Sequence, residues 1–170
     1  TIGDTLDATL VSATVDNIVR YPSMTAPSGY RLVTSHGTAY QPDTTDVFVG
    51  QNQTRILNLQ VSTGEGGVTN NLPITKIYFS TNGTTDASTD LMNVKLYRTT
   101  NTTPFNMGDT VGTPIMNPNG VFSFDLNYTL GSGITNFWLS YDLDPNSTIG
   151  NFIDATCDSV IINGFTYSIG

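Results

Sequence analysis

The chain has 170 residues and a formal net charge of -8, because 14 Asp and Glu residues face only six Lys and Arg residues. Thr, Ser, Asn and Gly fill 73 of the 170 positions, whereas Ala, Glu and Lys together fill nine, which excludes a helical bundle. The six cations are scattered and form no basic stripe for nucleic acid, and no apolar run approaches the roughly 18 residues that a membrane span needs.

Short stretches rich in β-branched and aromatic residues recur along the chain between Gly, Pro, Asn and Asp, and they predict strands. In chain order we expect strands at 9–15, 18–21, 30–33, 46–49, 55–61, 74–79, 93–98, 121–126, 136–141, 158–162 and 165–167. Asn163 and Gly164 should form the turn of a closing hairpin. Strands without a substantial helix predict an all-β fold, an antiparallel β-sandwich of jelly-roll or immunoglobulin-like type with about ten strands.

We expect two parts, a leading segment of residues 1–35 and a sandwich domain of residues 36–170. Residues 21–29 are rich in Pro and Ser and look like a linker or a long crossing loop. A Gly-rich stretch at 64–67 predicts a mobile hairpin tip. It is not expected to bind phosphate, because no helix pattern follows it.

The leading segment contains the strand-forming stretch 9–15, which could complete the sheet edge of a neighbouring copy by β-strand addition. Head-to-tail contacts of this kind do not close, so they generate filaments. The alternative is that the segment pairs within its own domain. The candidate self-association residues are Leu10, Val11, Ala13 and Val15.

The sequence offers little for catalysis. The only His, His36, stands in a polar context that predicts a turn, and the single Cys157 is expected to be a small buried hydrophobe. One His and one Cys cannot supply the three or four ligands of a zinc site. Most Asp residues stand in turn contexts, where they accept backbone hydrogen bonds. We therefore expect no catalytic residue and no enzyme.

Calcium is the one metal that the sequence suggests. Asp142, Asp144 and Asn146 place oxygen atoms at alternate positions, as hand-type calcium loops begin. The stretch departs from that pattern in having Ser147 in place of Gly and Ile153 in place of the bidentate Glu. A strand followed by an ordinary turn explains the same residues, so we expect no cofactor unless these three hold calcium.

Aromatic residues raise the question of carbohydrate binding, because sugar-binding modules present rings to solvent. Most of the 17 Tyr, Phe and Trp residues, Trp138 included, stand at strand positions that predict core packing. The candidates for sugar contact are Tyr21, Tyr30 and Tyr40, which lie in less regular sequence.

Several stretches together resemble the domain found N-terminal to BNR-repeat sialidases, which also occurs in tandem in Bacteroidota surface adhesins. The resemblance covers about residues 38–167, and the stretches that carry it are 56–57, 79–86, 94–97, Phe105, 136–143 and 150–157. It implies a non-catalytic β-sandwich on an exported protein. A Ser-x-Asp-x-Gly-x-Thr-Trp box, typical of sialidases, is missing from the sequence. Residues 1–35 fall outside the resemblance.

The same source implies O-glycosylation, because Bacteroidota modify exported proteins at Asp-Ser/Thr followed by an apolar residue or Thr. Four such triplets occur, and about one or two would arise by chance in a chain so rich in Thr. Ordinary turn and strand chemistry is the alternative. The candidate modification sites are Thr5, Thr44, Thr110 and Ser159.

Two functions remain after these exclusions. We expect an extracellular structural or adhesive module, a self-associating subunit or tandem unit of a bacterial surface fibre. Its partners would be copies of itself or neighbouring repeats, with neither nucleic acid nor membrane insertion. The alternative is a carbohydrate-binding accessory domain of a secreted sialidase-like or adhesin protein, whose partners would be surface glycans.

Overall fold

The computed structural model describes residues 5–6, 12–20, 31–32, 36–63, 72–100 and 104–169. The chain divides into two units, residues 1–34 and residues 35–170. This division lies one residue from the one that the sequence suggested.

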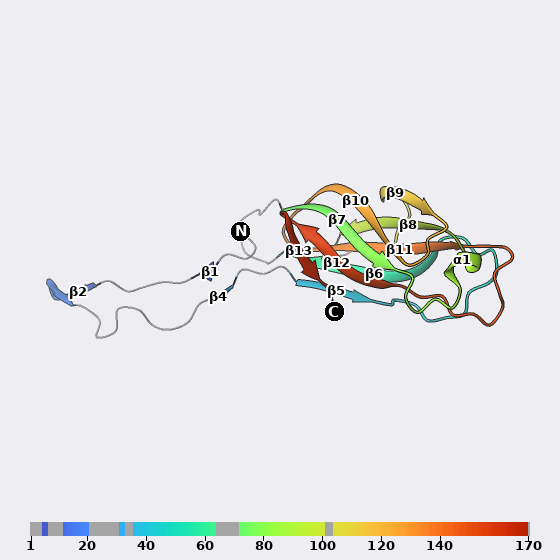
Figure 1. Cartoon of the computed structure of the whole chain (residues 1–170). Coiled ribbons are helices and arrows are strands. Elements are labelled where there is room, and N and C mark those ends of the chain that lie inside the picture. Colours follow the sequence, from blue (N-terminus) through green and yellow to red (C-terminus); the bar gives the residue numbers. More distant parts are fainter. Residues whose placement is uncertain are drawn as a thin grey trace. The chain divides into compact units, whose positions relative to one another are not determined.

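The unit 35–170 is an all-β sandwich built from a five-stranded and a four-stranded antiparallel sheet, as the sequence predicted (Figure 1). The five-stranded sheet has, in spatial order, β5 (His36–Tyr40), β6 (Thr54–Ser62), β11 (Ile134–Leu143), β8 (Leu91–Thr100) and β9 (Thr110–Met116). The four-stranded sheet has β10 (Val121–Leu130), β7 (Leu72–Ser80), β12 (Thr156–Ile162) and β13 (Phe165–Ser168).

The core lies between the two sheets. Alternate residues of each strand face inward, and the largest fully buried side chains include Phe79, Phe124, Phe137 and Tyr141. The ring of Tyr128 on β10 meets that of Phe137 on β11 edge to face, with centroids 6.4 Å apart. Aromatic and aliphatic burial of this kind drives the two sheets together.

The central strand β11 is buried on both of its faces, because a second cluster covers the outer face of the five-stranded sheet. Trp138 and Tyr97 are cross-strand neighbours on this outer face. Phe105, from the connection between β8 and β9, lies edge-on to both rings, with centroid distances of 5.7 Å and 5.6 Å. The indole N–H of Trp138 donates to Thr99 Oγ1 at 2.8 Å, so its burial leaves no polar atom without a partner.

Four details of the sequence prediction differ from the structure. Residues 46–49 form a connection, where a strand was expected. His36 is the first residue of strand β5, where a turn was expected. The sequence predicts a hairpin tip at 64–67, but the flanking strands β6 and β7 belong to different sheets and do not pair with each other. Residues 64–67 themselves lie outside the described part of the chain. Strand β9 was not expected. A four-residue helix, α1 (Ala87–Asp90), precedes β8.

The expected closing hairpin is confirmed. β12 pairs with β13 around Asn163 and Gly164, whose φ angles of 51° and 81° are those of a left-handed two-residue turn. Gly tolerates this conformation without cost and Asn tolerates it better than most residues.

The unit 1–34 contains a second hairpin of the same kind. β2 (Ala13–Val15) pairs with β3 (Ile18–Arg20) around Asp16 and Asn17, whose φ angles are 52° and 58°. Residues on either side of it form a further short pair, β1 (Thr5–Leu6) with β4 (Arg31–Leu32). The predicted linker, residues 21–29, lies outside the described residues.

Candidate binding surface at one end of the sandwich

Three connections meet at the end of the sandwich that carries α1 (Figure 1). They are residues 41–53 between β5 and β6, residues 81–90 between β7 and β8, and residues 144–155 between β11 and β12. Backbone hydrogen bonds tie them together: Gly50 N–H donates to the Asp144 carbonyl at 3.1 Å, and Thr85 N–H donates to the Phe152 carbonyl at 2.9 Å. These bonds fix the connections into one surface, which we call the loop end.

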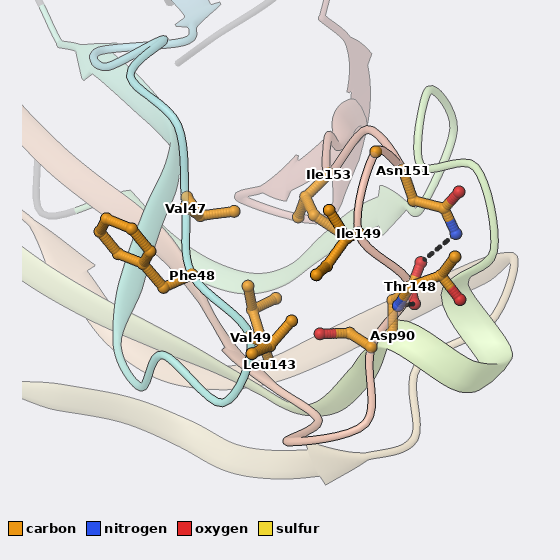
Figure 2. A pocket seen from close by; sticks show the side chains of 11 residues that line it. Val47, Phe48, Val49, Asp90, Leu143, Thr148, Ile149, Asn151 and Ile153 are labelled. Carbon is orange, nitrogen blue, oxygen red and sulfur yellow. Dashed lines mark hydrogen bonds between the residues drawn. The ribbon is translucent and has the colours of Figure 1, made fainter.

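The loop end encloses a cavity of about 240 Å³ (Figure 2). In Figure 2, Val47 points toward Ile149 and Ile153 across it. The apolar lining is unusually open to solvent, because Ile149 is 90% exposed and Phe48 is 77% exposed. Exposed apolar side chains gathered around a hollow are typical of an interaction surface. The residues that line the cavity are Val47, Phe48, Val49, Asp90, Leu143, Ser147, Thr148, Ile149, Gly150, Asn151 and Ile153.

A buried carboxylate holds one wall of this cavity in place. Asp90, the last residue of α1, is completely buried, and it accepts hydrogen bonds from Thr148 N–H and Asn151 Nδ2, both at 2.8 Å (Figure 2). These two bonds join the β7–β8 connection to the β11–β12 connection. Since they satisfy both carboxylate oxygens, Asp90 positions the loop that carries Ile149.

The loop end is acidic as well as apolar. Each of the four Lys and Arg residues of the unit 35–170 forms an ion pair, and their partners are Asp43, Asp125, Asp142 and Asp109. Of the loop-end carboxylates, only Asp43 is among these partners, and the other five form no ion pair with a Lys or Arg among the described residues. These five are Asp46, Asp86, Asp90, Asp144 and Asp154. A cationic partner is therefore favoured at this surface.

Of the three calcium candidates, Asp144 and Asn146 bond to each other at 3.1 Å, whereas Asp142 bonds to other residues. The buried carboxylate of Asp142 accepts hydrogen bonds from Lys95 Nζ at 2.6 Å, Gln53 N–H at 2.8 Å and Asn93 Nδ2 at 3.2 Å. Asp144 accepts from the Asn146 N–H at 2.7 Å within an ordinary turn. Among the described residues no three His, Cys, Asp or Glu side chains gather as metal ligands.

The environment of Asp142 also shifts its pKa. Burial by itself would raise the pKa of this carboxyl, but the hydrogen bonds from Lys95, Gln53 and Asn93 outweigh it and hold the pKa below its usual value. The charged carboxylate of Asp142 thus links its own strand, β11, to β8 and to the connection between β5 and β6.

The remaining residues named from the sequence fall in different places. Tyr40 ends β5 and is 42% exposed, and its hydroxyl accepts from Gln60 Nε2 at 3.4 Å. Tyr21, Tyr30, Leu10 and Val11 lie outside the described residues. Ala13 and Val15 lie on β2, paired with Arg20 and Ile18 of β3.

The glycosylation candidates differ in exposure. Thr44 is exposed in a turn where Asp43 Oδ1 accepts from the Thr45 N–H at 3.1 Å, and Thr110 is exposed at the start of the edge strand β9. Ser159 is half-buried on β12, between β7 and β13. Thr5 lies on β1.

Cys157 is buried, and burial raises the pKa of its thiol to about 12, helped by the neighbouring Asp158. A thiol with so high a pKa is a poor nucleophile at neutral pH.

A comparison with models of known protein families and with curated proteins found no match for this chain. No helix among the described residues has the length and apolar character to cross a lipid bilayer. The class that the structure itself defines is an all-β sandwich, and the surfaces described above are what it offers for function.

Proposed function

We propose that the chain is a non-catalytic structural module that assembles with copies of itself, or with neighbouring repeats, through the β2–β3 hairpin. The observation that carries the proposal is the exposure of this hairpin. Ile18 is 53% exposed and Val19 is 51% exposed, although both are large aliphatic residues. A two-stranded hairpin is at best marginally stable in water, so a surface that covers these residues would stabilise it.

The hairpin also has the geometry for strand addition. Among the described residues, each of its strands pairs with only the other, so each has a second edge with backbone donors and acceptors. Contact between the hairpin of one copy and the sandwich of the next is head to tail and propagates into a filament. The Thr- and Asn-rich, Lys-poor composition supports an extracellular location, and the resemblance to adhesin domains supports the bacterial cell surface.

A double variant in the hairpin and a single control variant on the sandwich, both made in the full chain, test this proposal. In the variant Ile18→Ser/Val19→Ser, we expect self-association measured by light scattering to fall to the monomer level. In the control Val121→Ser, an even more exposed aliphatic residue, on β10, is removed, and we expect association to persist. The proposal is wrong if the hairpin variant associates as strongly as the unchanged chain.

Carbohydrate binding is the second candidate, and the exposed ring of Tyr40 favours it. Tyr40 lies on the edge strand β5, and its hydroxyl bonds to Gln60, so an apolar ring and a polar amide stand side by side. Sugar-binding sites combine these two groups. Binding on a glycan array that disappears in Tyr40→Ala would establish this function, and the absence of binding by the unchanged chain would reject it.

A further inference from the structure

We propose that the cavity at the loop end receives the β2–β3 hairpin of a second copy. This inference rests on the proposed function and names the surface that the hairpin contacts. The hairpin and the cavity are complementary in apolar surface and in charge.

One face of the hairpin combines an aliphatic side chain with a cation. Ile18 and Arg20 are two residues apart on β3, so they point to the same face, and Ala13, opposite Arg20, leaves room beside it. No ion pair involves Arg20 among the described residues. The hairpin thus offers an apolar group and a positive charge roughly 7 Å apart along the strand.

The cavity offers the complementary groups. Its apolar wall, formed by Val47, Val49, Ile149 and Ile153, can cover Ile18. Asp46 directly precedes Val47, is exposed, and has no cation as partner in the unit 35–170. An exposed carboxylate at the margin of an apolar hollow suits a ligand with the character of Ile18 and Arg20.

The charge distribution favours a second copy over an unrelated acidic protein. All four cations of the unit 35–170 are engaged in ion pairs, whereas Arg20 and Arg31, the other two cations of the chain, belong to the unit 1–34. The hairpin has Asp16 in its turn and Arg20 at the open end of β3, so it presents beside Ala13 a cation of the kind that the acidic loop end lacks. Like-charged sandwich units would repel one another without such a contact.

A charge exchange tests the inference. Arg20→Glu and Asp46→Arg should each weaken self-association roughly tenfold or more, because each places like charges together in the contact. An equal mixture of the two variants should assemble as the unchanged chain does. In the mixture, the Glu side chain of one variant faces the Arg side chain of the other, and the unchanged Arg20 faces the unchanged Asp46.

The apolar part of the contact has its own test. Ile149→Ser should reduce association to the same degree, whereas Met116→Ser, which removes an exposed apolar residue of β9, should leave it unchanged. Sedimentation velocity measures all of these variants, and circular dichroism checks that each is folded. The inference is overturned if Ile149→Ser associates normally or if the charge-exchanged mixture stays monomeric.

These outcomes separate the inference from the proposed function. If the hairpin variant Ile18→Ser/Val19→Ser loses association but Ile149→Ser keeps it, the hairpin binds elsewhere, such as a sheet edge, and only the inference fails. If the unchanged chain stays monomeric, the proposed function fails. For a chain that stays monomeric, the double variant Ile18→Cys/Ile149→Cys gives a further test. A disulfide crosslink within one chain would mean that the hairpin occupies the cavity of the same copy, which overturns the head-to-tail arrangement.

Discussion

Single residues hold the sandwich together on both of its sides, and Phe105 is the clearest example on the outer face. Its ring covers Trp138 and Tyr97, and the guanidinium of Arg55 lies 5.9 Å from its centroid. We expect Phe105→Ala to lower the free energy of unfolding by roughly 2 kcal/mol, because the covering ring is lost and the cluster beneath it is exposed.

Urea denaturation measures this change. Phe152→Ala is the matched control, because Phe152 is 76% exposed and its loss should alter the unfolding free energy by less than about 0.5 kcal/mol. Equal effects of the two substitutions would contradict the role that we give to Phe105.

Asp142 gives a prediction that depends on pH. Its pKa is lowered in the folded state, so its charge stabilises the fold above the pKa of an unfolded Asp, about 3.9, and this stabilisation is lost as the pH falls through the lower, folded pKa. Asp142→Asn should cost about 2 kcal/mol at neutral pH, because Lys95 loses its ion partner.

The difference in unfolding free energy between the unchanged chain and Asp142→Asn should therefore be constant near neutral pH and shrink below about pH 4. Urea denaturation across this range measures it. A difference that does not change with pH would mean that the charge of Asp142 contributes nothing.

Among the elements, the turn of the β2–β3 hairpin controls how well the hairpin is formed. Asp16 and Asn17 both have positive φ, and Gly is preferred at the second position of such a turn. Asn17→Gly should strengthen self-association a few-fold by favouring the paired hairpin, and Asn17→Val should weaken it, because a β-branched residue resists positive φ. Sedimentation velocity distinguishes the two. If both substitutions changed self-association in the same direction, the backbone conformation of the turn would not control it.

The strands and turns that were predicted correctly from the sequence are those that follow a regular residue pattern. The long strands β6, β10 and β11 alternate or are continuously apolar, and the Asn163-Gly164 turn is a strong local signal. Strand β9 was missed because it contains Gly112 and Pro114, which usually end strands and are tolerated here at a sheet edge. Residues 46–49 contain three consecutive β-branched or aromatic residues, which favour a strand, but these side chains line the loop-end cavity.

The candidate site could not be read from the sequence for a different reason. Asp90, Thr148 and Val47 belong to three connections that are far apart along the chain and meet only when both sheets have formed. Local patterns do not carry this information. The Asp142 to Asn146 stretch was suggestive of calcium from spacing alone, yet Asp142 is engaged by Lys95, Gln53 and Asn93, which no spacing reveals.

At the scale of the whole molecule, the chain combines a sandwich whose cations are all paired with a separate hairpin that carries exposed aliphatic residues and Arg20. Such a division of charge and apolar surface between two units of one chain suits repeated contact between copies. In the function that we propose, these are the surfaces that meet in the assembly.

Head-to-tail assembly of the unchanged chain can be measured by sedimentation velocity over a wide range of concentration. We expect the average sedimentation coefficient to rise steadily with concentration, because head-to-tail contacts add copies without closing. A single monomeric species at every concentration would contradict it.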